Sequence, residues 1–104
     1  MEQATLTDST REGKRYMVKL RGKTIHFGSS EHDSYPFHKD KERRARYIQR
    51  HQKREDWTRS GMTTPGFWAK HVLWGEPTIR ESLQAIRRTF KVDTKDERSI
   101  KTPK

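Results

Sequence analysis

The sequence predicts a small α+β domain, in which a β-hairpin packs against one long and two shorter helices. Three observations support this fold class. An alternating segment with a central two-residue turn spans residues 15–28, cations recur with a helical repeat from residue 39, and apolar residues do so from residue 79. We expect the folded domain to span residues 15–90.

The hairpin follows from the segment RYMVKLRGKTIHFG, in which Arg21 and Gly22 provide the turn. Pairing outward from this turn predicts three cross-strand pairs: Leu20 with Lys23, Val18 with Ile25, and Tyr16 with Phe27. The apolar residues of both strands then share one face. Because an isolated hairpin is only marginally stable, we expect helices to cover that face.

The long helix is predicted at about residues 35–59, with Asp33 or Ser34 as its cap and Gly61 as its stop signal. Cations recur along it at steps of four, three, four and three, and we call these residues the basic ridge: Lys39, Arg43, Arg46, Arg50 and Lys53. The opposite side carries Phe37, Ala45 and Ile48, flanked by Tyr47 and His51. Arg44 falls on this apolar side, so we expect it to have a structural role.

Two shorter helices are expected at residues 65–74 and 79–90. The first begins at Thr64 and Pro65, and it is apolar on nearly every side, which leaves a central core segment or an exposed docking surface; we favour the core. The second begins with the capping box formed by Thr78 and Glu81. The predicted core comprises Tyr16, Val18, Leu20, Ile25, Phe27, Ile48, Phe67, Trp68, Val72, Leu83, Ile86 and Phe90.

Residues 1–14 and 91–104 are polar, mixed in charge and without a period, so we expect a flexible tail at each end, the second one basic. Hydrophobic residues make up 28% of the chain and charged residues 37%, so the core must be small and rich in aromatic side chains. The chain has no cysteine, which excludes disulfides and thiolate zinc sites. The sequence has no apolar run of membrane-spanning length and no secretory leader, so we expect a soluble, unsecreted protein with no transmembrane segment.

The net charge of +10 predicts an acidic partner: nucleic acid, an anionic membrane surface or an acidic protein. The candidate nucleic-acid or anion-binding residues are Lys39, Arg43, Arg46, Arg50, Lys53 and Arg54. The alternative is a solvated helix face on which nearby acidic residues form ordinary ion pairs. Trp57, at the end of the ridge helix, is the candidate for stacking on a base; the other two tryptophans are expected in the core.

Catalysis is not expected, because the chain lacks a Gly-rich phosphate loop, a GxSxG elbow and an HExxH motif. Its five histidines do not follow a metal-ligand spacing, so we expect no metal, no cofactor and no small-molecule substrate. A weaker alternative is a small metal-dependent nuclease that uses His38, Asp40 and Glu42 around a divalent ion.

Three blocks together carry a resemblance to a known family: KLRGKTIHFGSS (19–30), HKDKERRARYIQRHQKREDW (38–57) and TPGFWAKHVLWGEPTIRESL (64–83). They resemble a family of small basic proteins, uncharacterised or virion-associated, encoded by large double-stranded DNA viruses. The resemblance covers about residues 15–90 and brings no catalytic residues. It implies a place inside the viral particle, on packaged DNA or between capsid proteins.

These observations lead to one main expectation of function and one alternative, beside the weaker nuclease alternative given above. The main expectation is a non-enzymatic structural protein of a viral particle, a minor capsid or internal virion component that binds acidic capsid surfaces or packaged nucleic acid electrostatically. It would be found in the virion, and in the host cytoplasm or nucleus during assembly. The alternative is a dedicated nucleic-acid-binding protein that acts in replication or packaging.

Overall fold

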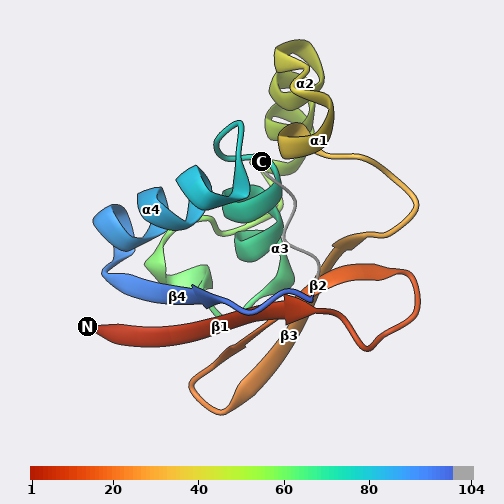
Figure 1. Ribbon diagram of the computed structural model, residues 1–104. Coiled ribbons are helices and arrows are strands. Elements are labelled where there is room, and N and C mark those ends of the chain that lie inside the picture. Colours follow the sequence, from red (N-terminus) through yellow and green to blue (C-terminus); the bar gives the residue numbers. More distant parts are fainter. Residues whose placement is uncertain (100–104) are drawn as a thin grey trace.

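The computed structural model describes residues 1–99, and it shows a four-stranded sheet with helices on one face (Figure 1). The elements are β1 (Glu2–Asp8), β2 (Lys14–Leu20), β3 (Lys23–Ser29), α1 (Tyr35–His38), α2 (Lys41–His51), η1 (Arg59–Gly61), α3 (Pro65–Trp68), η2 (Ala69–Leu73), α4 (Ile79–Phe90) and β4 (Val92–Asp96). The strand order is β3-β2-β1-β4. This mixture of one sheet and several helices confirms the α+β class.

The predicted hairpin is present as β2 and β3, with the predicted register. Leu20 pairs with Lys23, Val18 with Ile25 and Tyr16 with Phe27. Arg21 and Gly22 both have positive φ, as the tightest two-residue hairpin turn requires. The inward-facing residues of both strands are buried, so local alternation was sufficient to predict this part of the sheet.

The expected N-terminal tail at residues 1–14 is wrong for most of its length, because residues 2–8 form β1. This strand is antiparallel to β2 and parallel to β4, so it lies inside the sheet. Ala4 and Leu6 alternate with polar residues and are both buried against the helices. Burial of these two side chains removes apolar surface from water. The pairing of β1 with β2 also supplies hydrogen-bond partners to the edge of the hairpin that β3 does not cover.

The expected C-terminal tail is also wrong where the structure describes it. Residues 92–96 form β4, in which Val92 and Thr94 are buried. Beyond it, the backbone N–H of Ser99 donates to the carboxylate of Asp8 at 2.9 Å, which fixes the chain beside the end of β1. Residues 100–104 of the expected tail lie outside the described residues.

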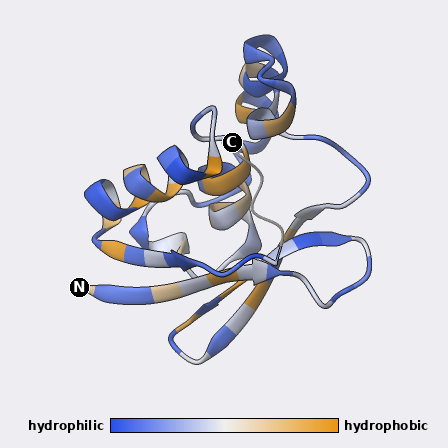
Figure 2. Cartoon of the chain, viewed as in Figure 1, coloured by the Kyte–Doolittle hydropathy of each residue, from blue (hydrophilic) through white to orange (hydrophobic). Residues whose placement is uncertain are grey.

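The single long helix expected at residues 35–59 is instead two helices, α1 and α2. Lys39 adopts a left-handed conformation that ends α1, and the Asp40 carboxylate then accepts the backbone N–H groups of Glu42 and Arg43 and begins α2. α2 stops at His51, after which the chain turns back. Figure 2 shows α2 mostly in hydrophilic colours, and in Figure 1 it stands away from the sheet.

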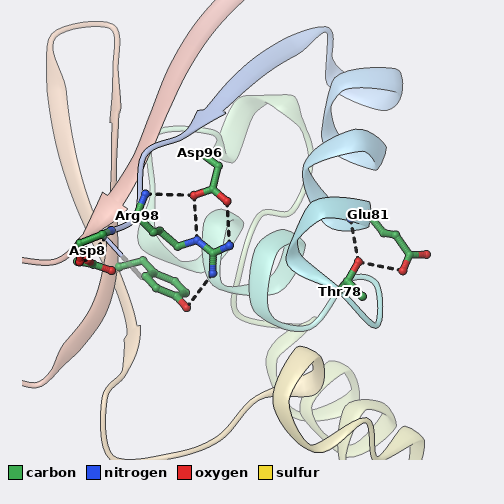
Figure 3. Close-up of polar contacts among 7 residues, drawn as sticks. Asp8, Thr78, Glu81, Asp96 and Arg98 are labelled. Atoms are coloured by element: carbon green, nitrogen blue, oxygen red, sulfur yellow. Dashed lines mark hydrogen bonds and ion pairs between the residues drawn. The ribbon is translucent and has the colours of Figure 1, made fainter. Parts of the chain in front are cut away.

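The other two predicted helices are present at nearly the expected residues. Residues 65–68 form α3, and residues 69–73 continue it without a break as the π-helical turn η2. Thr64 caps the start of α3. Phe67, Trp68 and Val72 are fully buried, which confirms that this segment belongs to the core. α4 spans the predicted residues 79–90, and Thr78 forms the expected capping contacts with Glu81 (Figure 3).

Most of the predicted core is buried, with two exceptions. Ile48 and Phe90 are only half-buried. Core residues that the prediction omitted are Ala4, Leu6, Met17, Tyr35, Tyr47, Met62, Leu73, Ile79 and Val92. Among the helices of the described chain, none has the length and apolar character needed to cross a membrane.

Candidate anion-binding cleft

A cleft of about 720 Å³ lies where α2, the end of β3 with its following loop, and the α3–η2 segment meet. α2 contributes Arg43, Arg46 and Arg50 to its lining, together with Tyr47 and His51. The facing surfaces include Phe27 and Ser29 of β3, and Ala69 and Leu73 of η2. One cleft therefore combines a row of cations with apolar and aromatic surface.

The three arginines share the cleft because their spacing of three and four residues places them on one side of α2. All three side chains are exposed. Across residues 1–99, none of them forms an ion pair with a carboxylate. Their guanidinium groups are therefore available to an anion from solution, and each offers a planar set of N–H donors.

Further charges modify the field of these arginines. Lys14, at the start of β2, also lines the cleft, as do the carboxylates of Asp33 and Glu55. Glu55 is already engaged, because its Oε2 lies 2.6 Å from Nδ1 of His51 and its carboxylate fills the space above Gly66. With four fixed cations against two carboxylates, the cleft remains positive.

A column of stacked rings holds α2 in place beside the cleft. The Tyr47 ring lies 4.5 Å from the Trp74 ring at an interplanar angle of 7°, and 4.2 Å from the imidazole of His51 at 21°. Tyr47 is 8% exposed, and burial raises its pKa above the usual value. The anchor of α2 is therefore Tyr47. The predicted apolar residues are placed differently, since Ala45 is exposed and Ile48 half-buried.

Arg44 has the structural role expected for it. Its Nε donates to the carbonyl oxygens of Trp74 at 2.9 Å and Gly75 at 3.0 Å, and its guanidinium lies over the Tyr35 ring. The bonds thus join α2 to the turn that follows η2. Its hydrogen-bond partners are backbone carbonyl oxygens.

The basic ridge of five residues is shorter than predicted, because the helix that was to carry it is interrupted. Lys39 precedes α2, and its ammonium donates to the carbonyl oxygens of Pro36 at 2.5 Å and Pro77 at 2.7 Å. Lys53 and Arg54 follow α2 in a turn, are exposed and do not line the cleft. Of the six candidate residues, Arg43, Arg46 and Arg50 are the ones that the structure brings together at the cleft.

Trp57 lies away from the cleft lining, and its ring already has neighbours. The ammonium of Lys70 is 5.6 Å from the ring centroid, and the Tyr47 ring is nearly parallel to it at 6.5 Å. The carbonyl oxygen of Trp57 also lies 2.9 Å from Nε2 of His71. Trp57 therefore packs against Tyr47 of α2 and against Lys70 and His71 of η2, and these contacts reduce the ring surface that is available for stacking on a base.

Two of the three residues of the nuclease alternative, His38 and Asp40, have local structural roles, and the third, Glu42, lies in the first turn of α2. His38 Nδ1 accepts the backbone N–H of Asp40 at 2.8 Å, and Asp40 caps α2. Burial, followed by the nearby charge of Arg43, lowers the pKa of His38. Within residues 1–99, no group of three or more His, Asp or Glu side chains is placed to hold a metal ion.

Sequence reasoning missed several residues that line the cleft. Lys14 falls in the expected N-terminal tail but begins β2, and the alternation of residues 14–20 is the signal that could have placed it there. Trp74 is expected in the core, and it also lines the cleft while stacked on Tyr47. Ser34 also lines the cleft, is 4% exposed, and its hydroxyl finds no hydrogen-bond partner in the described chain.

Residues 4–51 match a family of unknown function (DUF5754). The matched segment is slightly less than half of the chain and runs from β1 through α2, so it includes Arg43, Arg46 and Arg50. It ends before the α3–η2 side of the cleft. No curated protein and no solved structure matches the chain.

Proposed function

We propose that this chain is a non-enzymatic basic protein that binds nucleic acid through phosphate contacts from Arg43, Arg46 and Arg50. The observation that carries the proposal is the placement of three unpaired, exposed guanidinium groups along one concave face. Guanidinium groups form bidentate hydrogen bonds with phosphate oxygens, and a row of them matches a row of phosphates.

The helix geometry supports this function. With a rise of about 1.5 Å per residue, the Cα atoms of successive cleft arginines are about 4.5 and 6 Å apart along the α2 axis. Long side chains can extend this spacing, so the three groups can reach neighbouring phosphates of one strand. The net charge of +10 adds a long-range attraction for any polyanion.

The same chemistry fits the wider role that the family resemblance implies. In a viral particle, a protein of this kind would be a minor internal component that holds packaged nucleic acid, or that binds acidic capsid surfaces with the same arginines. Nucleic acid is the stronger candidate partner because the cleft also offers apolar surface, which a purely ionic contact with an acidic protein does not need.

The proposal is tested by a salt titration of binding to random-sequence duplex DNA, comparing the wild type with the Arg46→Gln/Arg50→Gln variant. Loss of two phosphate contacts should reduce the slope of log affinity against log salt by about two and weaken binding to all sequences alike. The matched control is Arg80→Gln/Arg88→Gln, which removes the same charge from exposed positions on α4, outside the cleft.

Two results would contradict the proposal. If both double variants reduced the slope equally, total charge would explain binding and the cleft would have no special part in it. If the wild type did not bind nucleic acid at near-physiological salt but bound an acidic protein, the arginines would serve a protein interface.

A further inference from the structure

We propose that the cleft accepts unpaired nucleotides of a single strand in preference to a duplex. This inference rests on the proposed function and specifies the form of nucleic acid that the site takes. It is carried by the shape of the cleft, by the distribution of charged and apolar groups in it, and by one buried hydroxyl without a partner.

The shape of the cleft favours a single strand. A volume of about 720 Å³ lies in the range of pockets that enclose small organic molecules, roughly 300–1,000 Å³. A duplex carries its phosphates on the outside of a stiff rod with its bases inside, so it can touch only the rim of such a hollow. An unpaired strand is flexible and can place a nucleotide within it.

The chemical groups that line the cleft also match an unpaired nucleotide. Arg43, Arg46 and Arg50 lie on the α2 side, whereas Ala69, Leu73 and Phe27 contribute apolar groups from η2 and β3. An unpaired nucleotide has the same two parts, an anionic phosphate and a base with apolar faces. Sites for single strands combine a cationic track with apolar or aromatic contacts in this way.

The stacked rings narrow down how a base can be bound. The Tyr47 ring is already stacked with both Trp74 and His51, at centroid distances of 4.5 and 4.2 Å, and the residue is buried, so its ring is not free to stack on a base. The planar guanidinium groups of the arginines remain as stacking surfaces, and guanidinium planes are known to stack on unpaired bases. We therefore assign base contacts to the arginine planes and the apolar side of the cleft.

Ser34 carries a buried hydroxyl at the cleft that lacks a hydrogen-bond partner in the described chain. Its side chain is more than nine-tenths buried and lines the cleft, yet its hydroxyl makes no hydrogen bond within residues 1–99. A buried polar group without a partner is costly. The hydroxyl oxygen is closed to solvent, and rotation of the Ser34 side chain toward the cleft would let a phosphate oxygen or a base edge become its partner. A duplex held at the rim would not reach this group.

The experiment measures the affinity of the full chain for a labelled mixed-sequence oligonucleotide, as a single strand and as its duplex, at equal ionic strength. A free nucleoside monophosphate serves as competitor. Base contacts in the cleft should make the single strand bind at least about tenfold more tightly than the duplex. Ala69→Leu narrows the cleft without changing charge, and it should lower affinity for the single strand by about tenfold while leaving duplex binding unchanged.

Two further variants keep this test decisive. Ala85→Leu makes the same substitution at a half-buried position on α4 outside the cleft, so it should retain the preference for the single strand. Ser34→Ala removes a hydroxyl that makes no hydrogen bond in the described chain, so this variant should fold. It therefore still tests the inference if Ala69→Leu does not fold. It should weaken single-strand binding by about threefold to tenfold.

The outcomes separate this inference from the proposed function. A preference for the single strand that is lost in Ala69→Leu and kept in Ala85→Leu supports the inference. Equal affinity for both forms overturns it and leaves phosphate binding in place, whereas no binding to either form overturns both. A free nucleotide that competes as strongly as the oligonucleotide would assign the cleft to a small ligand and overturn the strand assignment.

Discussion

Arg98 and Asp96 form a two-point contact in which Nε donates to Oδ1 at 2.9 Å and Nη2 donates to Oδ2 at 2.8 Å (Figure 3). Arg98 is 6% exposed, and its Nη1 also donates to the hydroxyl of Tyr16 at 3.2 Å. Because Tyr16 belongs to β2, this one side chain connects the segment after β4 with the hairpin.

Replacing Arg98 with Ala should therefore destabilise the fold. The change removes a buried cation and leaves the Asp96 carboxylate and the Tyr16 hydroxyl without this partner, at a cost of about 3 kcal/mol in the free energy of unfolding. Urea denaturation followed by circular dichroism measures the loss. The control is Arg88→Ala, an exposed arginine on α4 that should change stability by less than about 0.5 kcal/mol. Equal stability of the two variants would show that the contact adds nothing.

The hairpin and α4 could be predicted from the sequence because their signals are local. Alternation around Arg21 and Gly22 sets the register of β2 and β3, and the capping box at Thr78 sets the start of α4. β1 and β4 have weaker signals, since their buried apolar residues are only Ala4, Leu6 and Val92. These two segments become strands because they pair with each other across almost the whole length of the chain, which no local pattern reports.

The site could be predicted only in part, because local patterns place some of its residues and contacts between distant segments place the others. The helical repeat correctly placed Arg43, Arg46 and Arg50 on one side of a helix. It could not show that Lys39 would adopt a left-handed conformation and leave the helix. Nor could it show that Ser34 would line the same cleft, since that position depends on how the loop after β3 packs against α2.

Tyr47 should control both the position of α2 and the affinity of the cleft. Tyr47→Ala removes the ring that stacks with Trp74 and with His51, and loss of a buried aromatic side chain costs about 3 kcal/mol. The arginines would then lose their common orientation, so nucleic-acid affinity should fall although no charge has changed. Tyr47→Phe keeps the ring and should bind as the wild type does. Amide hydrogen exchange across residues 41–51 reports the loosening of α2, and unchanged exchange in Tyr47→Ala would contradict this role.

His71 should make the protein less stable in mild acid. Burial lowers its pKa from 6.5 to about 4, and Nε2 of the neutral ring is 2.9 Å from the carbonyl oxygen of Trp57, to which it can donate. Between these two pH values the unfolded chain binds a proton that the folded chain excludes, so stability falls as the pH is lowered from about 6.5 to about 4 and this contribution then levels off. The full effect is about 3 kcal/mol.

The test compares the pH dependence of the free energy of unfolding for the wild type and His71→Gln. Glutamine can donate to the same carbonyl but does not titrate, so its stability profile should be flatter over this window. Carboxylates contribute to acid destabilisation in both proteins and cancel in the comparison. Parallel profiles would show that His71 titrates alike in the folded and unfolded states.

Lys39 should contribute to stability and not to binding, although it belongs to the helical repeat of cations. Its ammonium is held by the carbonyl oxygens of Pro36 and Pro77, which join the end of α1 to the segment before α4. Lys39→Gln should thus lower the free energy of unfolding by about 1–2 kcal/mol. It should leave the salt dependence of nucleic-acid binding unchanged, whereas Arg46→Gln should reduce the slope by about one. A reduction in slope for Lys39→Gln equal to that for Arg46→Gln would mean that Lys39 leaves its carbonyl partners and contacts a phosphate when nucleic acid binds.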